Sequence, residues 1–579
     1  MFKKNFLSLL SISILFFAIS CSSNSAKPMK DGNFSGTGEG RSGEINLTIS
    51  VKNGKVTNVK VNSEAETDFA KPAIQKISNQ VINGTEISAL DTVSGATMTS
   101  NGTIEALQNA IKASKGIVEK PKKYKNTKCD IVVIGAGGAG LSAAIQASQK
   151  GADVIVLEKM GIVGGNSNYS TAGLNASETG VQRKLGIEDT NEQYFEDTMK
   201  GGHYLNDPDL VHTLVENSAD AVDWLSSLGA DLSDVGKMAG STNPRTHRPK
   251  GGAPIGSHLI SVLKKQTMNS ENIGVVEIRT RNKVTDVLTD DEGAVCGVVV
   301  EAQSGTYEIK AKAVIVASGG FGANQEMVVK YRPEYAGFNT TNHAGATGDA
   351  VEFLKKVDAQ FIQMDQIQTH PTVVVGSGIM ITEAVRGNGA IMVNREGNRF
   401  ASEMLPRDAM SQAVLAQTGK SAFLVFDQGI RESLKAIESY DAQGLLTSGN
   451  TPEELAEKLG IPPQTFSQTI KTYNQYQKNG NDLEFERKGS EMPRAIEKAP
   501  YYAVEVAPAI HHTMGGLKIN TKAQVLNNSN EVIPGLFAAG EVTGGVHGAN
   551  RLGGTAVADI VIYGRIAANS AIKYANLEE

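Results

Sequence analysis

The chain has 579 residues, a net charge of −6, and 40% hydrophobic and 20% charged residues. This length exceeds what one hydrophobic core supports, so several domains are expected, and the slightly acidic balance excludes a basic nucleic-acid-binding surface. Glycine is frequent, with 61 residues in clusters, which indicates close approaches of the backbone to a ligand rather than flexible linkers.

The N-terminus is predicted to be a targeting segment. Two lysines precede an apolar run over residues 6–19, which is too short for a membrane span and suits a signal sequence. The run ends in A-I-S-C, which resembles a bacterial lipobox with Cys21 as the lipidated residue. Ordinary cleavage with an incidental Cys21 is the alternative. We expect residues 1–20 to be a lipoprotein signal peptide, 21–33 a tether, and the protein to be exported and membrane-anchored on the periplasmic side of the cell envelope.

Beyond this segment only two cysteines remain, Cys129 and Cys296. They cannot form a disulfide framework, and the chain has no C-x-x-C-H haem-attachment motif. No other segment is long and apolar enough to cross a membrane.

Residues 34–116 are predicted to form a small α+β domain. A glycine-rich stretch with alternating apolar residues indicates strands, and Asn53-Gly54 indicates a hairpin turn between two of them. Helical periodicity follows over 72–80, and a second helix is expected over 100–114 with Ser100 as its cap. The lysine-rich residues 117–128 are predicted to be a solvated linker.

The segment D-T-V-S-G-A-T over residues 91–97 lies just before that second helix. From the residues alone it is a polar turn. It also resembles the flavinylation motif of FMN-binding domains, which implies that a flavin transferase attaches FMN to Thr97 through a phosphoester.

A second domain is expected to begin at Cys129 with a dinucleotide-binding unit. Gly135, Gly137 and Gly140 follow an apolar strand over 130–134 and open a helix, which allows a tight turn and close approach to a pyrophosphate at the helix N-terminus. Glu158 ends the next strand, where it can bind a ribose hydroxyl. A purely structural glycine turn is the alternative.

Further glycine-rich segments favour FAD over a nicotinamide cofactor. Gly164-Gly165-Asn166-Ser167 follows the second strand, and the stretch G-L-F-A-A-G-E ends at Glu541 near the C-terminus. A second glycine-rich segment so far downstream suits a large, enclosed cofactor. The alternative is that these glycines only allow helices to pack on strands.

Cationic and acidic residues are scattered through residues 370–551, and spacing alone does not bring them together. Each has a simpler interpretation as a structural histidine or a surface arginine. The set is His370, Thr382, Glu383, Arg386, Arg407, His512 and Arg551.

From about residue 129 to 574 the chain resembles the soluble fumarate reductases of the flavocytochrome c type. The segments D-T-M-K-G-G-H-Y-L-N-D-P-D-L-V, T-N-H-A-G-A-T-G-D, Q-T-H-P-T, H-H-T-M-G-G and A-A-G-E-V-T-G-G-V-H-G-A-N-R-L-G-G occur in the order typical of that family. The resemblance implies non-covalent FAD, with Asp349 among the FAD-binding residues, and a clamp domain that closes over the substrate.

The same resemblance implies a role for each member of the set. Arg551 and His512 would grip one substrate carboxylate, and His370 and Thr382 the other. Arg407 would donate a proton to the substrate carbon next to the one that receives hydride, and Glu383 and Arg386 would return a proton to it. Because free arginine has a pKa above about 12, this acid works only with close positioning and rapid reprotonation.

The predicted fold class is α/β: a Rossmann-like FAD-binding domain over 129–361 and 513–579, an inserted α+β clamp domain over 362–512, and the small FMN-binding domain in front. In haem-bearing members a cytochrome domain precedes the FAD domain, and here the FMN-binding domain takes that place. Electrons would pass from an external, membrane-associated donor through FMN and FAD to the substrate.

We therefore expect a reductase of the C=C bond of a small unsaturated carboxylate. Fumarate is favoured because His370 and Thr382 suit a second carboxylate. Urocanate or another acrylate-type acid is the alternative with the same cofactors. A non-catalytic electron-shuttling flavoprotein and a dehydrogenase working in the opposite direction are the other hypotheses.

Overall fold

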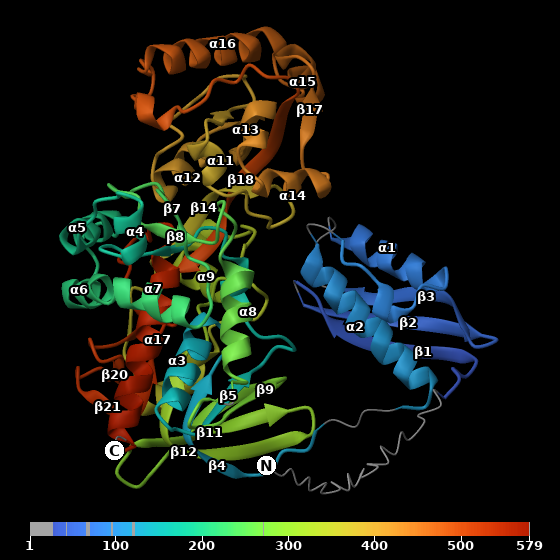
Figure 1. Ribbon diagram of the computed structural model, residues 1–579, viewed down its shortest axis with the longest axis vertical. Helices are drawn as coiled ribbons and strands as arrows, with labels where there is room; N and C mark the ends of the chain where they lie inside the picture. The colour runs from blue at the N-terminus through green and yellow to red at the C-terminus, as the bar shows by residue number, and fades with distance from the viewer. Residues whose placement is uncertain are drawn as a thin grey trace, which may run out of the picture.

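A computed structural model describes residues 27–41, 43–64, 66, 70–93, 96–117, 122–269 and 271–577, with the side chains of 63, 64, 97 and 98 excepted. Figure 1 shows three parts: a small domain in blue, a large domain that runs from teal to green and ends in red, and an orange domain at the top. The predicted signal peptide and Cys21 lie outside the described residues. No helix among those described is both long and apolar enough to span a membrane.

The small domain is a three-stranded antiparallel sheet covered by two helices. Strands β1 (Gly32–Glu39), β2 (Glu44–Lys52) and β3 (Lys55–Glu64) are ordered β1-β2-β3. The predicted Asn53-Gly54 turn is confirmed, because both residues have positive φ between the paired ends of β2 and β3. Helices α1 (Lys71–Ile82) and α2 (Thr97–Ser114) cover the apolar face of the sheet.

Helix α2 lies against β1 because glycine removes side chains from the contact. A Cβ at Gly36 would overlap the carbonyl oxygen of Ala106, and a Cβ at Gly38 would overlap that of Gly102. These glycines therefore serve helix–strand packing, whereas the sequence indicated close approach to a ligand. The predicted start of this helix at Ser100 is also wrong: α2 begins at Thr97, and the Ser100 hydroxyl accepts a hydrogen bond from the backbone N–H of Val93 at 3.0 Å.

The large domain is built on a mixed sheet whose centre is parallel. Strands β12 (Gly305–Val316), β4 (Thr127–Ile134), β5 (Val154–Glu158) and β9 (Val276–Thr280) lie side by side in parallel, and β21 (Val532–Ala538) also pairs with β12. Strands β10 (Asn282–Thr289) and β11 (Val295–Ala302) extend β12 as an antiparallel meander. The sheet buries near-continuous apolar runs, as parallel strands covered on both faces do.

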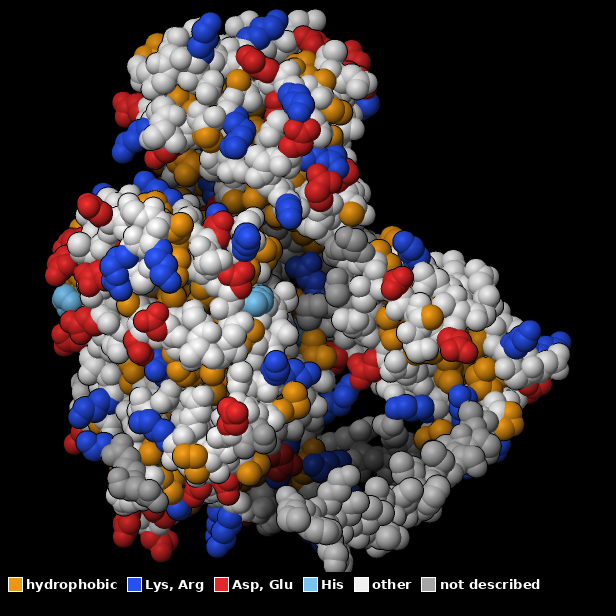
Figure 2. Space-filling model, in the orientation of Figure 1, with side chains coloured by type: hydrophobic (Ala, Val, Ile, Leu, Met, Phe, Trp, Pro, Cys, Tyr) orange, Lys and Arg blue, Asp and Glu red, His pale blue; other side chains and the backbone are white. Residues whose placement is uncertain are grey.

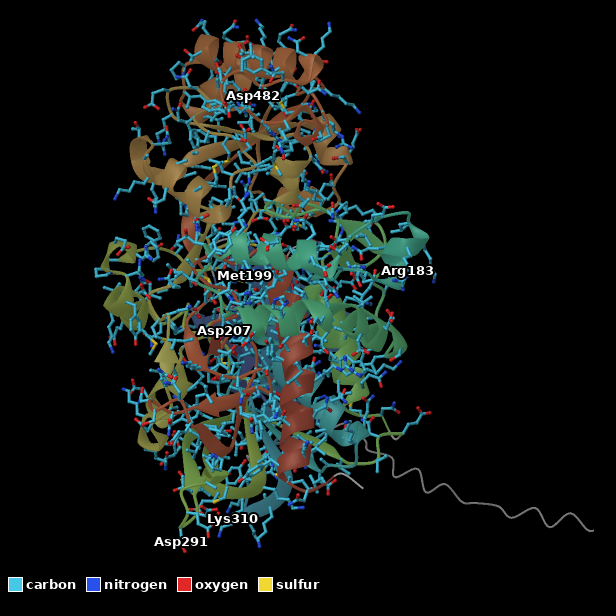
Figure 3. All side chains as sticks on the ribbon, turned by 90° about the vertical axis from the view of Figure 1, so that its left-hand side faces the viewer. Arg183, Met199, Asp207, Asp291, Lys310 and Asp482 are labelled. Atoms are coloured by element: carbon cyan, nitrogen blue, oxygen red, sulfur yellow. The ribbon has the colours of Figure 1, made fainter. Side chains whose placement is uncertain are left out.

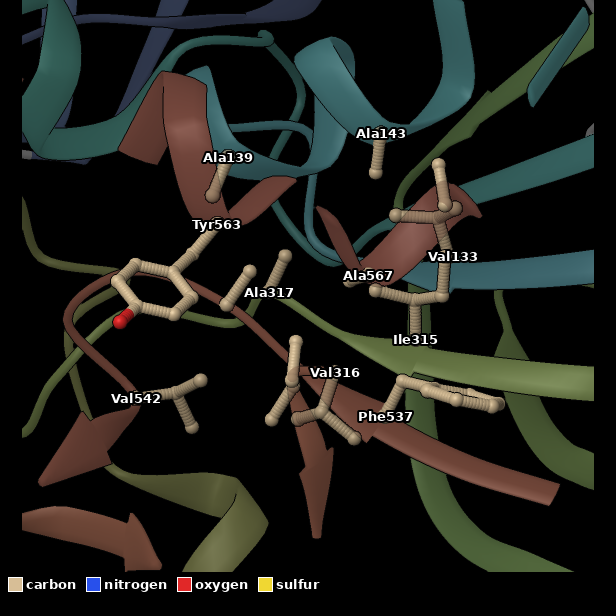
Figure 4. Close-up of a cluster of buried hydrophobic side chains, with 14 of the residues drawn as sticks. Val133, Ala139, Ala143, Ile315, Val316, Ala317, Phe537, Val542, Tyr563 and Ala567 are labelled. Carbon is tan, nitrogen blue, oxygen red and sulfur yellow. The ribbon is translucent and has the colours of Figure 1, made fainter. Parts of the chain in front are cut away.

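Two helices from opposite ends of the chain cover one face of this sheet. Helix α3 (Gly138–Gln149) follows β4, and α17 (Thr555–Tyr574) is near the C-terminus. They pack closely because a Cβ at Gly564 would lie 2.6 Å from the carbonyl oxygen of Ala139. Figure 4 shows the apolar cluster between these helices and the sheet. The last residues of the chain thus complete the nucleotide-binding domain.

The upper domain has its own sheet and core. Its strands β14 (Ile367–Val374), β18 (Tyr501–Thr513), β16 (Ala422–Asp427) and β15 (Ile391–Val393) are antiparallel in that order, and β17 (Thr447–Gly449) also pairs with β18. Helix α15 (Pro452–Leu459) has Thr451 as its N-cap. Helix α16 (Pro463–Asn479) lies at the far end of this domain (Figure 1).

The upper domain leaves and rejoins the large domain through two adjacent strands. Chain enters it along β14 and returns along β18, and the two strands pair from Ile367 with Thr513 to Val374 with Val506. Figure 3 shows the consequence from the side: Asp482 lies at one end of the molecule and Asp291 and Lys310 lie at the other. The chain therefore passes between the two domains along two paired strands.

Candidate active site

The predicted dinucleotide turn has the geometry that its glycines require. Gly135 has φ +103°, and a Cβ there would overlap the backbone carbonyl of Ala317 at the end of β12. A Cβ at Gly140 would overlap the carbonyl oxygen of Gly135, so this glycine lets α3 pack beneath the turn. Gly137 has no such crowding, since its nearest neighbour, the carbonyl oxygen of Gly164, lies 3.8 Å away. The open side at Gly137 is where a pyrophosphate has room.

Glu158 is buried at the end of β5 and fixes the same turn. One of its carboxylate oxygens accepts a hydrogen bond from the N–H of Ala136 at 3.0 Å, and the other from the N–H of Met160 at 2.8 Å. Burial raises the pKa of this carboxyl, although the two backbone N–H donors oppose the rise. Glu158 lines a cavity beside the glycine turn, as a ribose-binding carboxylate should.

This first cavity collects the predicted FAD-binding residues except Gly140, which lies below the turn. Ser167 accepts a hydrogen bond from the N–H of Gly138 at 3.1 Å, and Asn166 donates to Glu541 at 3.3 Å. Asp349 pairs with Lys159 at 2.8 Å. The remaining predicted members of the wall are Gly135, Gly137 and Glu158. The glycine cradle, the buried acid and the length of the wall fit FAD.

A second cavity, of about 630 Å³, adjoins the first. The two share Asn166, Ser167, Glu541 and Ile560 in their walls. The second cavity is also lined by Arg407, Arg551, His511 and His512. A ligand held there would lie next to a cofactor held in the first cavity.

Two arginines, a glutamate and a glutamine form a buried cationic centre at this second cavity. Arg407 forms an ion pair with Glu383, and its NH1 donates to Gln368 Oε1 at 3.0 Å. Arg551 donates to the same oxygen at 3.3 Å. Burial and the neighbouring Arg407 lower the pKa of Arg551 to about 9. The centre therefore holds more positive charge than its carboxylate balances, which suits an anionic ligand.

Glu383 lies between three basic groups. Its Oε1 atom is 3.9 Å from Arg386 NH2 and 3.8 Å from His370 Nε2, in addition to its contact with Arg407. Burial alone would raise the pKa of Glu383, but Arg407 and Arg386 outweigh it and keep the pKa below its usual value. Arg386 is 1% exposed, so it does not itself reach solvent, and its NH1 donates to the carbonyl oxygen of Glu403 at 2.6 Å.

The histidines come from the two strands that join the domains. His370 lies in β14, and His511 and His512 lie in β18, where Gln368 pairs with His512. A bulge on either side of Thr369–His370 in the ladder sets the direction of His370. All three histidines have pKa values well below 6.5, because burial and nearby arginines disfavour the charged ring. They are therefore neutral near pH 7.

The two adjacent histidines face different neighbours. The His511 ring meets the His370 ring edge-on at 5.2 Å, and its Nδ1 lies 2.8 Å from the Thr341 hydroxyl. His512 lies toward the first cavity, with Nδ1 3.6 Å from Glu541. The family resemblance implied a role for His512 and none for His511. The alternation of side chains along β18 was the signal that separates the two faces.

Not every predicted substrate residue lies on the cavity wall. His370 and Thr382 are buried just behind it, and the N–H of Thr382 donates to the Tyr440 hydroxyl at 3.1 Å. Gln368, which bridges two arginines, was not predicted. A glutamine carries no sequence signal of its own for such a bridge.

Comparison with known proteins places both cofactor domains. The model of the FAD binding domain family matches residues 130–557, and that of the FMN-binding domain family matches residues 40–112. A fumarate reductase (cytochrome) of Shewanella frigidimarina is 48% identical over 77% of this chain and 77% of its own length. An NADH:fumarate oxidoreductase of Klebsiella pneumoniae is 40% identical over 94% of this chain and 59% of its own length.

Two further comparisons bear on the whole architecture. A urocanate reductase of Eggerthella lenta is 34% identical over 93% of this chain and 92% of its own length. Among solved structures, the open conformation of a flavocytochrome c3 fumarate reductase superposes with a TM-score of 0.67 at 44% identity. That superposition covers 78% of this chain and 79% of the other.

Proposed function

Because the chain belongs to the family of FAD-dependent fumarate reductases and related enoate reductases, we propose that it reduces fumarate to succinate. The family assignment makes it a flavin-dependent oxidoreductase with an FAD-binding and an FMN-binding domain, of the type that carries covalent FMN. Its substrate class is the unsaturated carboxylates on which such relatives act. The choice of fumarate within that class is our proposal.

The observation that carries the proposal is the pair of arginines on one cavity wall. Arg407 and Arg551 share Gln368 and lie beside the FAD cavity, with Glu383 as the carboxylate that contacts Arg407. A dicarboxylate supplies the negative charge that this centre lacks. Arginine binds a carboxylate through two hydrogen bonds and so fixes its orientation as well as its position.

The site residues divide the chemistry among them. FAD held by the glycine turn, Glu158 and Asp349 would supply the hydride that one alkene carbon receives. Arg551 and the histidines of β18 hold one carboxylate, and His370 and Thr382 hold the other when the clamp closes. Arg407 donates a proton to the neighbouring carbon, so that the alkene gains one hydride and one proton. Glu383 and Arg386 then return a proton to Arg407.

His511 joins this set as a carboxylate ligand. It lies on the wall of the second cavity and faces His370, whereas His512 approaches Glu541 and the FAD cavity. A neutral histidine with a fixed tautomer offers one N–H donor to a carboxylate. The Thr341 hydroxyl lies 2.8 Å from Nδ1 of His511; where it donates to Nδ1, the N–H on Nε2 is left for the carboxylate.

Urocanate is the second candidate, because the urocanate reductase relative aligns over both cofactor domains of this chain. A panel of fumarate, urocanate and acrylate, tested with reduced viologen as donor, decides between them. We expect fumarate to give the highest kcat/KM. A monocarboxylate would leave the groups that bind the second carboxylate without a partner. Faster turnover of urocanate would contradict the fumarate assignment and leave the Arg407 chemistry in place.

We further propose how the enzyme is supplied with electrons. FMN attached to Thr97 by a flavin transferase receives them from an external, membrane-associated donor, and Cys21 anchors the chain to the membrane. The family of the small domain supports the covalent flavin. The sequence around Cys21 supports the anchor.

A further inference from the structure

One cavity lies where all three domains meet. The wall that carries the arginine pair continues through Tyr169 and Ser170 of the FAD domain, Ala96 and Thr99 of the FMN-binding domain, and Ser439 and Tyr440 of the clamp. Figure 2 shows a hollow at this junction with basic side chains around it. A volume of about 630 Å³ lies within the range of small-molecule sites, roughly 300–1,000 Å³. A four-carbon dicarboxylate fills only part of it.

The FMN-binding domain presents the start of α2 to this cavity. Ala96 and Thr99, on either side of Thr97–Met98, both line it. Thr99 is 1% exposed, and its hydroxyl has no hydrogen-bond partner within the described part of the chain. No side chain of the described residues caps this 18-residue helix. Free N–H groups at a helix start favour a phosphate, and the buried hydroxyl offers a further polar contact.

All three domains bring positive charge to the same space, and the FAD domain and the clamp also bring aromatic rings. Arg41, Lys250 and Lys435 line the cavity, one from each domain. Tyr169 and Tyr440 lie on its wall as well. Cations suit a phosphate and aromatic faces suit a planar ring system. This combination matches the chemistry of a flavin mononucleotide rather than that of a small dicarboxylate.

Specific contacts hold the FMN-binding domain at this position. The Tyr169 hydroxyl donates to the backbone carbonyl of Arg41 at 2.6 Å, and the Arg41 guanidinium lies 5.1 Å from the centre of the Tyr169 ring. Arg281 approaches Glu105 of α2 at 3.5 Å. Tyr169 also packs against His343 of the FAD cavity, at 5.8 Å between ring centres. The docking surface is thus continuous with the cofactor-binding part of the FAD domain.

We propose that this junction is a chamber that receives the FMN carried by Thr97. The clamp contributes Lys435, which immediately precedes α14 (Ala436–Ala442), and Tyr440 within that helix. The inference rests on the proposed attachment of FMN at Thr97. The FMN then contacts all three domains at once. Tyr440 connects the chamber to the substrate side, because its hydroxyl accepts the N–H of Thr382.

Hydrogen–deuterium exchange tests the chamber without measuring activity. The full-length, FAD-loaded protein is made with and without its flavin transferase, so that the two samples share one sequence and differ only in FMN. Intact mass establishes the FMN content. We expect exchange at 165–172 and 435–443 to be several-fold slower in the FMN-bearing sample. Equal exchange in the two samples, with FMN present by mass in one, overturns the chamber.

A charge reversal locates the contact within the clamp. Lys435→Glu should remove most of the FMN-dependent protection at 435–443 without changing the flavin mass. Lys471→Glu, an exposed lysine on α16, is the matched control and should keep the protection in full. A Lys435→Glu protein that keeps the protection contradicts the role of Lys435. Absence of flavin mass from wild type made with the transferase contradicts the attachment at Thr97, and the chamber with it.

Discussion

Arg407 and Glu383 form an ion pair in which each side chain is 9% exposed. Arg407 is the first residue of α12 (Arg407–Leu415), and Glu383 immediately precedes α11 (Ala384–Gly387). The contact therefore joins the starts of two helices of the clamp at the cavity wall. A carboxylate in direct contact with the proton donor is the arrangement that reprotonation requires.

Replacement of Arg407 should separate chemistry from binding. Arg407→Ala removes the proton donor, and we expect kcat to fall by about 10³-fold, while KM changes far less because Arg551 remains. Steady-state kinetics with reduced viologen measure both constants, and FAD content is the control for folding. A KM effect as large as the kcat effect would show that Arg407 acts mainly in ground-state binding.

Gln368 should act as a positioning residue for both arginines. Gln368→Leu removes the oxygen that Arg407 and Arg551 share. Hydrogen bonds to charged groups are worth about 1.5–3 kcal/mol, so we expect kcat/KM for fumarate to fall by roughly tenfold to a hundredfold. Gln366→Leu, just before β14 and bonded to Asp365, is the matched control. Equal activity of the two variants would remove Gln368 from the mechanism.

Acid should destabilise the free enzyme through its buried histidines. His370, His511 and His512 have pKa values well below 6.5 when folded, whereas in the unfolded chain they take up protons as pH falls through about 6.5. The contribution of these histidines to the free energy of unfolding is therefore fully present above about pH 6.5 and is lost progressively as the pH falls below it.

Thermal unfolding between about pH 7.5 and 5.5 measures this loss. Succinate should reduce this loss of stability. Its carboxylates would stabilise the protonated histidine rings and offset the repulsion from Arg407, Arg386 and Arg551. His511→Asn should flatten the dependence of Tm on pH, since one of the three proton-binding differences is gone. Parallel curves for wild type and variant would contradict the histidine origin of the effect.

Replacement of a glycine in β1 should lower the stability of the FMN-binding domain without affecting the other domains. Gly36→Ala places a Cβ against the carbonyl oxygen of Ala106, and such overpacking costs about 1–3 kcal/mol. We expect a lower unfolding temperature for this domain and unchanged viologen-driven activity. Lys60→Ala, exposed on β3 of the same sheet, should leave both unchanged. A loss of viologen activity in Gly36→Ala would mean that the domains unfold together.

The membrane anchor has a direct test. Cys21→Ser should move the protein from the membrane fraction to the soluble fraction of its host, because several acyl chains on one terminus are needed for a stable hold. Mass of the mature N-terminal peptide identifies the modification. An unmodified Cys21 in wild type would contradict the lipoprotein hypothesis.

Local signals in the sequence predicted the fold well. The glycine turn, the strand before it and Glu158 are contiguous and periodic, so the nucleotide-binding unit followed from spacing alone. The Asn53-Gly54 hairpin was equally local. The start of α2 was misplaced by three residues because Ser100 looked like a cap, whereas its hydroxyl binds the preceding loop.

The active site was harder to predict from the sequence because its residues are far apart in the chain. Gln368, Arg407 and Arg551 meet only after β14 and β18 pair and α12 packs beside them. Resemblance to a family supplied that set, and spacing could not. For the same reason Gln368 and His511 were not predicted. Their roles became visible only from the strand register and the lining of the cavity.

The two-stranded connection between the clamp and the FAD domain has a mechanical consequence. Gln368 and His370 on β14 and the histidine pair on β18 lie at the root of the clamp, whereas α16 lies at its tip. A rigid body that swings about its root moves least there and most at its tip. Gln368 holds Arg407 and Arg551 at this root, and Glu383 lies 3.8 Å from His370 there, so a swing about the root would leave these groups close together. Such a layout would let the outer part of the clamp move while the groups that bind the acid and donate the proton stay together.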